Sequence, residues 1–151
     1  MALLLSVFIA DREPRRAATC LRLLRGAKGI RVVGQAKTSR VAISGVAAKP
    51  DILLFDLKLG KSGGVAPLLL IRARSPRTKV ILLTDRVTDA QILTAISQGA
   101  RGYLEPSRLR PFLIKAVRAV HAGETWVPRA MVAKIIDRLA NLTAKQASAE
   151  R

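Results

Sequence analysis

The sequence is poor in the residue types that build most metal centres and covalent catalytic centres. It contains one cysteine, Cys20, and one histidine, His121. A single cysteine excludes an intramolecular disulfide and any zinc site made of several cysteines. A single histidine excludes histidine-rich metal sites and most catalytic triads. Aromatic residues make up only 3% of the chain, so stacking platforms for single-stranded nucleic acid are scarce.

Acidic residues are also few. The 151 residues include 27 Lys+Arg against 10 Asp+Glu, which gives a formal net charge of +17. Such an excess attracts polyanions without sequence preference. Two stretches are rich in basic residues: Arg72, Arg74, Arg77 and Lys79, and then Arg101, Arg108, Arg110, Lys115 and Arg118. Two interpretations stay open, a scattered solvated surface or an electrostatic footprint for nucleic acid, and one contiguous basic face would favour the second.

No hydrophobic run is long enough to cross a bilayer. The apolar N-terminus, residues 1–10, lacks a positively charged leading segment and runs directly into Asp11 and Arg12. It therefore fails as a signal peptide and is too short for a membrane span. We expect no membrane association and a cytoplasmic location. The length suits a single domain.

Short apolar runs alternate with helical patterns along the chain. The predicted strands are residues 3–10, 30–36, 51–55, 79–84 and 102–104. The predicted helices are residues 14–26, 39–48, 67–74 and 88–98, and a fifth that opens at Pro106 or Ser107; a loop is expected at residues 60–64. Five alternations imply βαβ crossovers, and hence an α/β fold with a doubly wound, five-stranded parallel sheet and helices on both faces.

Polar residues follow the predicted strands at the point where each one ends. In doubly wound folds, ligands bind at the carboxyl ends of the strands. The residues at these ends are Asp11 and Arg12, Asp56, Thr84 and Asp85, and Glu105 and Pro106. Because these ends share one edge of the sheet, the sequence predicts a single polar pocket there.

The pattern changes after Gly123. Val132, Ile135, Ile136, Leu139 and Leu142 recur at helical spacing, which predicts an amphipathic sixth helix followed by a polar tail from residue 143. A bare apolar strip is unusual on a monomer. We therefore expect this helix to fold back on its own domain or to pair across a two-fold axis.

Several segments, in this order and spacing, resemble the receiver domain of response regulators: IADREP (residues 9–14), DILLFDLKL (51–59), VILLT (80–84) and GARGYL (99–104). The segment KAVRAVHAGETWVP (115–128) is similar to the LuxR/NarL-type subfamily. The resemblance implies a flavodoxin-like sheet of order 2-1-3-4-5. It further implies a receiver domain at residues 1–124 and a C-terminal linker helix with a polar tail at residues 125–151. We expect the output helix-turn-helix domain of such regulators to be absent, as in a fragment of a longer regulator or a chain that has lost it.

The resemblance also implies roles for five residues. Asp56 matches the phosphoacceptor that takes a phosphoryl group from a histidine kinase. Asp11 matches one acid of the Mg²⁺-binding pair, and in the family the backbone carbonyl at the position of Lys58 is a further ligand. Thr84 matches the hydroxyl that contacts the phosphoryl group, and Tyr103 matches the aromatic residue that changes rotamer on activation.

Three positions depart from the family pattern. Arg12 replaces the second acid of the pair, Pro106 replaces a lysine, and Asp85 replaces a small residue. Mg²⁺ requires oxygen ligands, and an arginine cannot deprotonate to provide one. We therefore expect an atypical receiver without cofactor, in which Mg²⁺ binds weakly or not at all and Asp56 phosphorylation is impaired. We also expect the side chain of Arg12 or Lys58 to reach the Asp56 carboxylate as a substitute charge.

The leading hypothesis is a signalling module, not an enzyme, that controls transcription through dimerisation or partner docking. Its expected partners are a second copy of the chain and a histidine kinase. We expect DNA contact only through a missing output domain or through non-specific charge. The alternative hypothesis is a basic nucleic-acid-binding module on a receiver scaffold. A small α/β enzyme is least favoured, because the predicted pocket has no histidine or cysteine and no carboxylate pair placed for acid–base chemistry.

Overall fold

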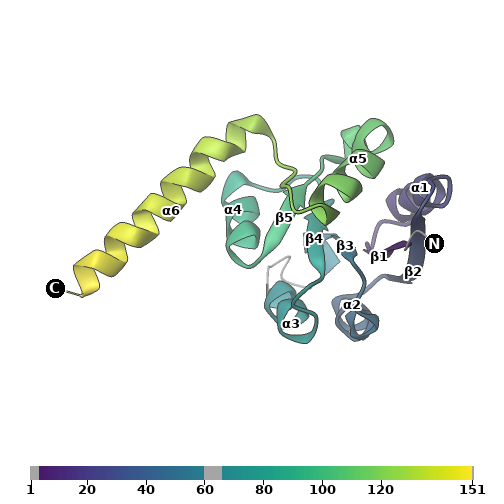
Figure 1. The fold of residues 1–151 in the computed structure, drawn as a ribbon, viewed down its shortest axis with the longest axis horizontal. Coiled ribbons are helices and arrows are strands. Elements are labelled where there is room, and N and C mark those ends of the chain that lie inside the picture. The colour runs from purple at the N-terminus through teal and green to yellow at the C-terminus, as the bar shows by residue number, and fades with distance from the viewer. Residues whose placement is uncertain (1–3, 60–65, 151) are drawn as a thin grey trace.

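A five-stranded parallel sheet forms the centre of the molecule (Figure 1). The computed structural model describes residues 4–59 and 66–150. The strands are β1 (Leu5–Ala10), β2 (Ile30–Ala36), β3 (Ile52–Phe55), β4 (Lys79–Leu82) and β5 (Ala100–Tyr103). Their order across the sheet is β2-β1-β3-β4-β5, which confirms the predicted flavodoxin-like topology. The loop expected at residues 60–64 lies outside the described residues.

Helices cover both faces of this sheet. They are α1 (Pro14–Arg25), α2 (Ser39–Gly45), α3 (Ala66–Arg74), α4 (Asp89–Ser97), α5 (Leu109–His121) and α6 (Arg129–Ala149). The chain also forms short 3₁₀ turns, which are η1 (Val46–Ala48), η2 (Leu57–Leu59) and η3 (Pro106–Arg108). α1 and α5 pack on one face, and α2, α3 and α4 lie on the other (Figure 1).

The central strand explains why the sheet is so well fixed. Leu53 and Phe55 of β3 point into the apolar layer under α2, α3 and α4, and Ile52 and Leu54 point into the layer under α1 and α5. All four side chains are fully buried, as expected for a parallel strand covered on both faces. Burying a large aliphatic or aromatic side chain contributes about 1.5–3 kcal/mol. The register of β1, β3 and β4 is thereby set, and their carboxyl ends meet at one edge.

The sixth helix is longer than the sequence pattern predicted. The expected polar tail from residue 143 is helical to Ala149. Met131 is buried, and Ile135 packs against the same apolar layer, so the first turns fold back on the domain. Val132, Ile136, Leu139 and Leu142 are exposed along α6, and its C-terminal part projects beyond α4 (Figure 1). The predicted fold-back is thus confirmed only for the first turns. Within residues 4–59 and 66–150, no helix is both long enough and apolar enough to span a membrane.

Candidate functional site

Three buried polar side chains meet at the carboxyl edge of the sheet. Asp11 follows β1, Asp56 follows β3 and Thr84 lies just beyond β4, and each is at most 1% exposed. The Thr84 hydroxyl donates a hydrogen bond to Asp56 Oδ1 at 3.2 Å and accepts one from the Leu57 amide at 2.5 Å. The sequence-based prediction of one polar pocket is confirmed for the ends of β1, β3 and β4. It is wrong for Glu105, which follows β5 and lines a different cavity beside Tyr103.

Backbone amides fix the direction of both carboxylates. Asp56 accepts hydrogen bonds from the amides of Lys58 at 2.9 Å and Arg12 at 3.4 Å. Asp11 accepts one from the amide of Glu13, at 2.8 Å, immediately before α1. No buried polar side-chain atom among the described residues lacks a hydrogen-bond partner. The two acids therefore have little freedom to reorient.

The positive charge of the pocket comes from Arg16, in the first turn of α1. Its guanidinium binds Asp11 in bidentate fashion, with Nε 2.5 Å from Oδ2 and Nη2 2.8 Å from Oδ1. Nη2 also lies 3.3 Å from Asp56 Oδ2, and Nη1 lies 3.8 Å from Asp85 Oδ1. The Arg16 side chain is only 10% exposed. One arginine thus joins the acids that follow β1, β3 and β4.

The prediction that the Arg12 or Lys58 side chain supplies this charge is wrong. Both residues contact Asp56 through backbone amides. The Arg12 side chain is exposed, and the Lys58 ammonium lies 3.5 Å from Asp85 Oδ1. Sequence reasoning missed Arg16 because a basic residue in an amphipathic helix usually belongs to the solvated face.

A signal for Arg16 was nevertheless present in the sequence. The first turn of α1 carries Arg15 and Arg16 and no acid. A cation is unfavourable at a helix N-terminus, where the helix dipole is positive, unless a carboxylate compensates for it. Asp11, five residues before Arg16, is the compensating group.

Burial and charge act against each other at this pair. Burial raises the pKa of Asp11, and the neighbouring Asp56 charge raises it further; the Arg16 hydrogen bond and charge lower it, but the pKa stays above its ordinary value. Burial alone would lower the pKa of Arg16, but its hydrogen bond to Asp11 and the charges of Asp11, Asp56 and Asp85 raise it overall. The arginine therefore remains charged, and it stabilises the ionised form of Asp11.

The other predicted site residues lie around the pocket mouth or outside it. Asp85, Arg16 and Pro106 line an open cleft of about 540 Å³. Pro106 starts η3 and brings no charge. Tyr103 is buried at the end of β5 and lines a separate cavity of about 400 Å³ with Phe112 and Trp126. Burial raises the pKa of Tyr103, with smaller contributions from nearby carboxylates, so its phenol stays protonated.

The pocket as built does not fit a Mg²⁺ ion. Both oxygens of Asp11 are bound to Arg16, and one oxygen of Asp56 faces the same guanidinium. Mg²⁺ binds through oxygen ligands, often one or two carboxylates with several waters. Across the described part of the chain, no group of three or more His, Cys, Asp or Glu side chains could hold a metal ion. The carboxylates are arranged around a guanidinium instead.

A family model for the response regulator receiver domain matches residues 7–118. The chain belongs to this family. Among curated relatives, it is 35% identical over 89 residues to the transcriptional regulatory protein LnrK of Bacillus subtilis, covering 59% of this chain and 40% of LnrK. It is 28% identical over 144 residues to the DNA-binding transcriptional activator DevR/DosR of Mycobacterium tuberculosis, covering 95% of this chain and 66% of that protein.

A solved structure gives the same result. The fold superposes with a TM-score of 0.78 on a LuxR-family two-component response regulator from Aurantimonas, at 25% identity, covering 91% of this chain and 99% of that one. The relatives are of the NarL/LuxR type. Receiver domains of this type work with histidine kinases and can dimerise, and response regulators are generally not enzymes. The matched region spans about two-fifths of the length of the first curated relatives.

Proposed function

We propose that this receiver domain controls transcription as an atypical response regulator, in which Arg16 occupies the role of the metal and Mg²⁺-dependent phosphorylation of Asp56 is impaired. The observation that carries the proposal is the guanidinium that bridges Asp11 and Asp56. Asp56 is the proposed phosphoacceptor and Thr84 its hydroxyl partner. The signal then passes through partner docking or dimerisation.

Electrostatics supports this substitution. Asp11 and Asp56 are both buried, so a nearby cation must neutralise their negative charges. A bidentate arginine–carboxylate pair is among the strongest ionic contacts in proteins. A metal ion could enter only if Arg16 left Asp11, which would break two short hydrogen bonds. At position 12, where the family places a second acid, an exposed arginine adds further positive charge.

The same geometry limits phosphoryl transfer. The transition state of this reaction is stabilised by positive groups placed around the transferred phosphoryl oxygens. Here Arg16 is engaged with Asp11, Lys58 lies against Asp85, and Pro106 offers no donor. A histidine kinase, a homodimer, a cytoplasmic location and the division of the chain near residue 124 remain predictions that belong to this proposal.

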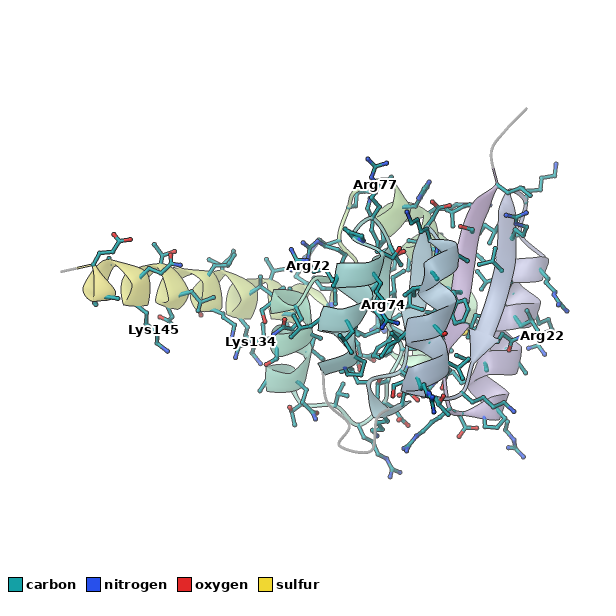
Figure 2. All side chains as sticks on the ribbon, turned by 90° about the horizontal axis from the view of Figure 1, so that it is seen from below. Arg22, Arg72, Arg74, Arg77, Lys134 and Lys145 are labelled. Carbon is teal, nitrogen blue, oxygen red and sulfur yellow. The ribbon has the colours of Figure 1, made fainter. Side chains whose placement is uncertain are left out.

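The distribution of basic residues favours signalling over nucleic-acid binding. Exposed basic side chains occur on helices all around the molecule (Figure 2). They include Arg15, Arg22 and Arg25 of α1, Arg40 of α2, Arg74 of α3, Arg110, Lys115 and Arg118 of α5, and Lys145 of α6. A spread of this kind is typical of a solvated surface, whereas a nucleic-acid footprint gathers on one face.

Magnesium titration of wild-type protein tests the proposal, with backbone amide chemical shifts near Asp56 as the readout. We expect no saturable shift at millimolar Mg²⁺. Arg12→Asp should restore weak binding, and Arg12→Asp combined with Arg16→Ala should restore stronger binding, because the cation is removed and an oxygen ligand is added. Pro106→Lys should not restore it.

Asp56→Asn in the double variant is the matched control, and it should abolish the restored binding. A parallel incubation with phosphoramidate, followed by intact-mass measurement, reports phosphorylation directly. Saturable millimolar Mg²⁺ binding by the wild type, lost on Asp56→Asn, together with Mg²⁺-dependent phosphorylation would overturn the proposal.

A further inference from the structure

A second hollow lies at the opposite edge of the sheet, between α6, α4 and the end of α3. It has a volume of about 350 Å³. Arg72 reaches it from α3, Arg101 from the start of β5, and Leu139 from α6. Figure 2 places Arg72 toward the side of the domain from which α6 extends, and Arg22 at the far end. We refer to this hollow as the α6 groove.

The walls of the α6 groove are apolar. Leu93 and Ile96 of α4 face Ile135, Leu139 and Leu142 of α6 across it. Leu139 is 59% exposed and Leu142 is 49% exposed, so their side chains meet solvent instead of protein. The groove therefore offers aliphatic surface that a partner side chain would bury, and such burial favours binding.

The rim of the α6 groove is positively charged. Arg72, Arg101 and Arg138 line it, and none of the residues lining it is acidic. An adjoining hollow of about 530 Å³ shares Arg72 and Arg101 and adds further basic residues. The adjoining hollow contains two acids. Asp51 accepts hydrogen bonds from the amide and hydroxyl of Ser6, and Glu124 is exposed. The α6 groove thus combines apolar walls with a basic rim.

We propose that the α6 groove binds an acidic amphipathic segment of a partner protein. Aliphatic side chains of such a segment would enter between α4 and α6, and its carboxylates would pair with Arg72 and Arg101. Arginine is suited to this contact because its planar fork binds carboxylates in bidentate fashion. The groove lies at the edge of the sheet opposite to Asp56.

Charge decides between this occupant and the two others that the surface suggests. A second copy of the chain brings a net charge of +17 and only 10 acids, so it is a poor electrostatic match for this basic groove. A nucleic-acid backbone would pair with the arginines but would leave the apolar walls of the groove without a partner. An acidic segment with a hydrophobic stripe satisfies both parts of the groove.

The test uses a synthetic helical peptide with leucine at i, i+3, i+4 and i+7 and glutamate at most other positions, labelled for fluorescence anisotropy with the full chain. A scrambled peptide of the same composition removes the stripe but keeps the charge. Arg72→Ala with Arg101→Ala removes two charges at the groove, and Arg22→Ala with Arg25→Ala removes two exposed charges on α1 as the matched control. Leu139→Ser with Leu142→Ser tests the apolar walls of the groove.

We expect the striped peptide to bind at least tenfold more tightly than the scrambled one. The Arg72/Arg101 pair and the Leu139/Leu142 pair of substitutions should each weaken binding about tenfold, and the Arg22/Arg25 pair about twofold or less. Equal losses in the two arginine variants, or equal binding of the scrambled peptide, would overturn the proposal. So would displacement of the peptide by duplex DNA of matched charge, or concentration-dependent self-association in sedimentation that Leu139→Ser abolishes.

Discussion

Arginine has opposite roles at the two edges of the sheet. Arg16, at the carboxyl edge, is almost fully enclosed and bound to Asp11 and Asp56. Arg72 and Arg101, at the amino edge, are exposed beside aliphatic side chains. The first arginine stabilises the domain from within, and the other two present charge to the outside. The surroundings of an arginine, and not its identity, determine which of these roles it has.

The difference has an energetic basis. An exposed ion pair contributes little, about 0–1 kcal/mol, because water solvates both partners well. Removing one member of a buried pair costs about 3–5 kcal/mol, because the remaining charge is left uncompensated. Replacing a buried arginine therefore destabilises the fold, whereas an exposed arginine can contact a binding partner without being needed for stability.

Arg16→Ala should give the largest effect. We expect the free energy of unfolding at neutral pH to fall by about 3–5 kcal/mol, since Asp11 and Asp56 would be left without their cation. Urea denaturation measures this loss. It should shrink in acid, where protonated Asp11 no longer needs a counterion.

The neighbouring exposed residue provides the control for that experiment. Arg15→Ala removes the same charge from the same helical turn and should change stability by no more than about 0.5 kcal/mol. Equal losses in the two variants would mean that Arg16 stabilises the helix in general and not the acidic pocket.

Met131→Ala should give the next largest effect and test the contrast within α6. Met131 is buried against the apolar layer under α4, so we expect a loss of about 2–5 kcal/mol. The amide hydrogens of α6 should exchange faster once this contact is gone. Leu139→Ala, on the exposed part of the same helix, should cost about 0.5 kcal/mol or less. A similar loss in both variants would show that the projecting part of α6 is also packed in solution.

Cys20 should make a smaller contribution to the free energy of unfolding, one that depends on pH because its thiol is buried. Burial, assisted by the Asp11 charge, raises the pKa of its thiol from 9.0 to about 12. Because the folded pKa lies above the unfolded value, the thiol favours folding below pH 9, and this contribution is lost as the pH rises toward 12. The expected slope is about 1.4 kcal/mol per pH unit.

Comparison with Cys20→Ala isolates this contribution from other alkaline titrations, including that of Tyr103. Urea midpoints for both proteins between pH 8 and pH 11 provide the measurement, and stability of the variant should fall less steeply. Identical slopes would mean that the thiol ionises equally well in the folded protein.

Much of this architecture was predictable from local sequence. β3 is a short, wholly apolar run, as a parallel strand covered on both faces requires. The convergence of Asp11, Asp56 and Thr84 then follows from topology, because parallel strands end at one edge. These predictions depend on the alternation of apolar runs with helical patterns, which is visible in the sequence, whereas the strand order came from the family resemblance.

The error at Arg16 and the length of α6 have different causes. A long arginine side chain can reach from a helix to a strand end several residues away, and strand-end patterns say nothing about such reach. For α6, the apolar stripe ends at Leu142, but the residues after it include good helix formers such as Ala, Lys and Gln. Hydrophobic periodicity therefore located the helix but neither its buried contact nor its solvated end: Met131 is buried, whereas Val132, Ile136, Leu139 and Leu142 of the stripe are exposed.

The segment that joins α5 to α6 makes β5 and α6 move together. Trp126 donates its amide to the Arg101 carbonyl at 3.1 Å and accepts a bond from the Tyr103 amide at 2.7 Å. This bridge covers the outer edge of β5, and α6 starts only three residues later, at Arg129. A helix of 21 residues is about 31 Å long, so a rotation of about 10° at the bridge would carry its far end through about 5 Å. A small rotation of β5 would therefore produce a much larger displacement at the far end of α6.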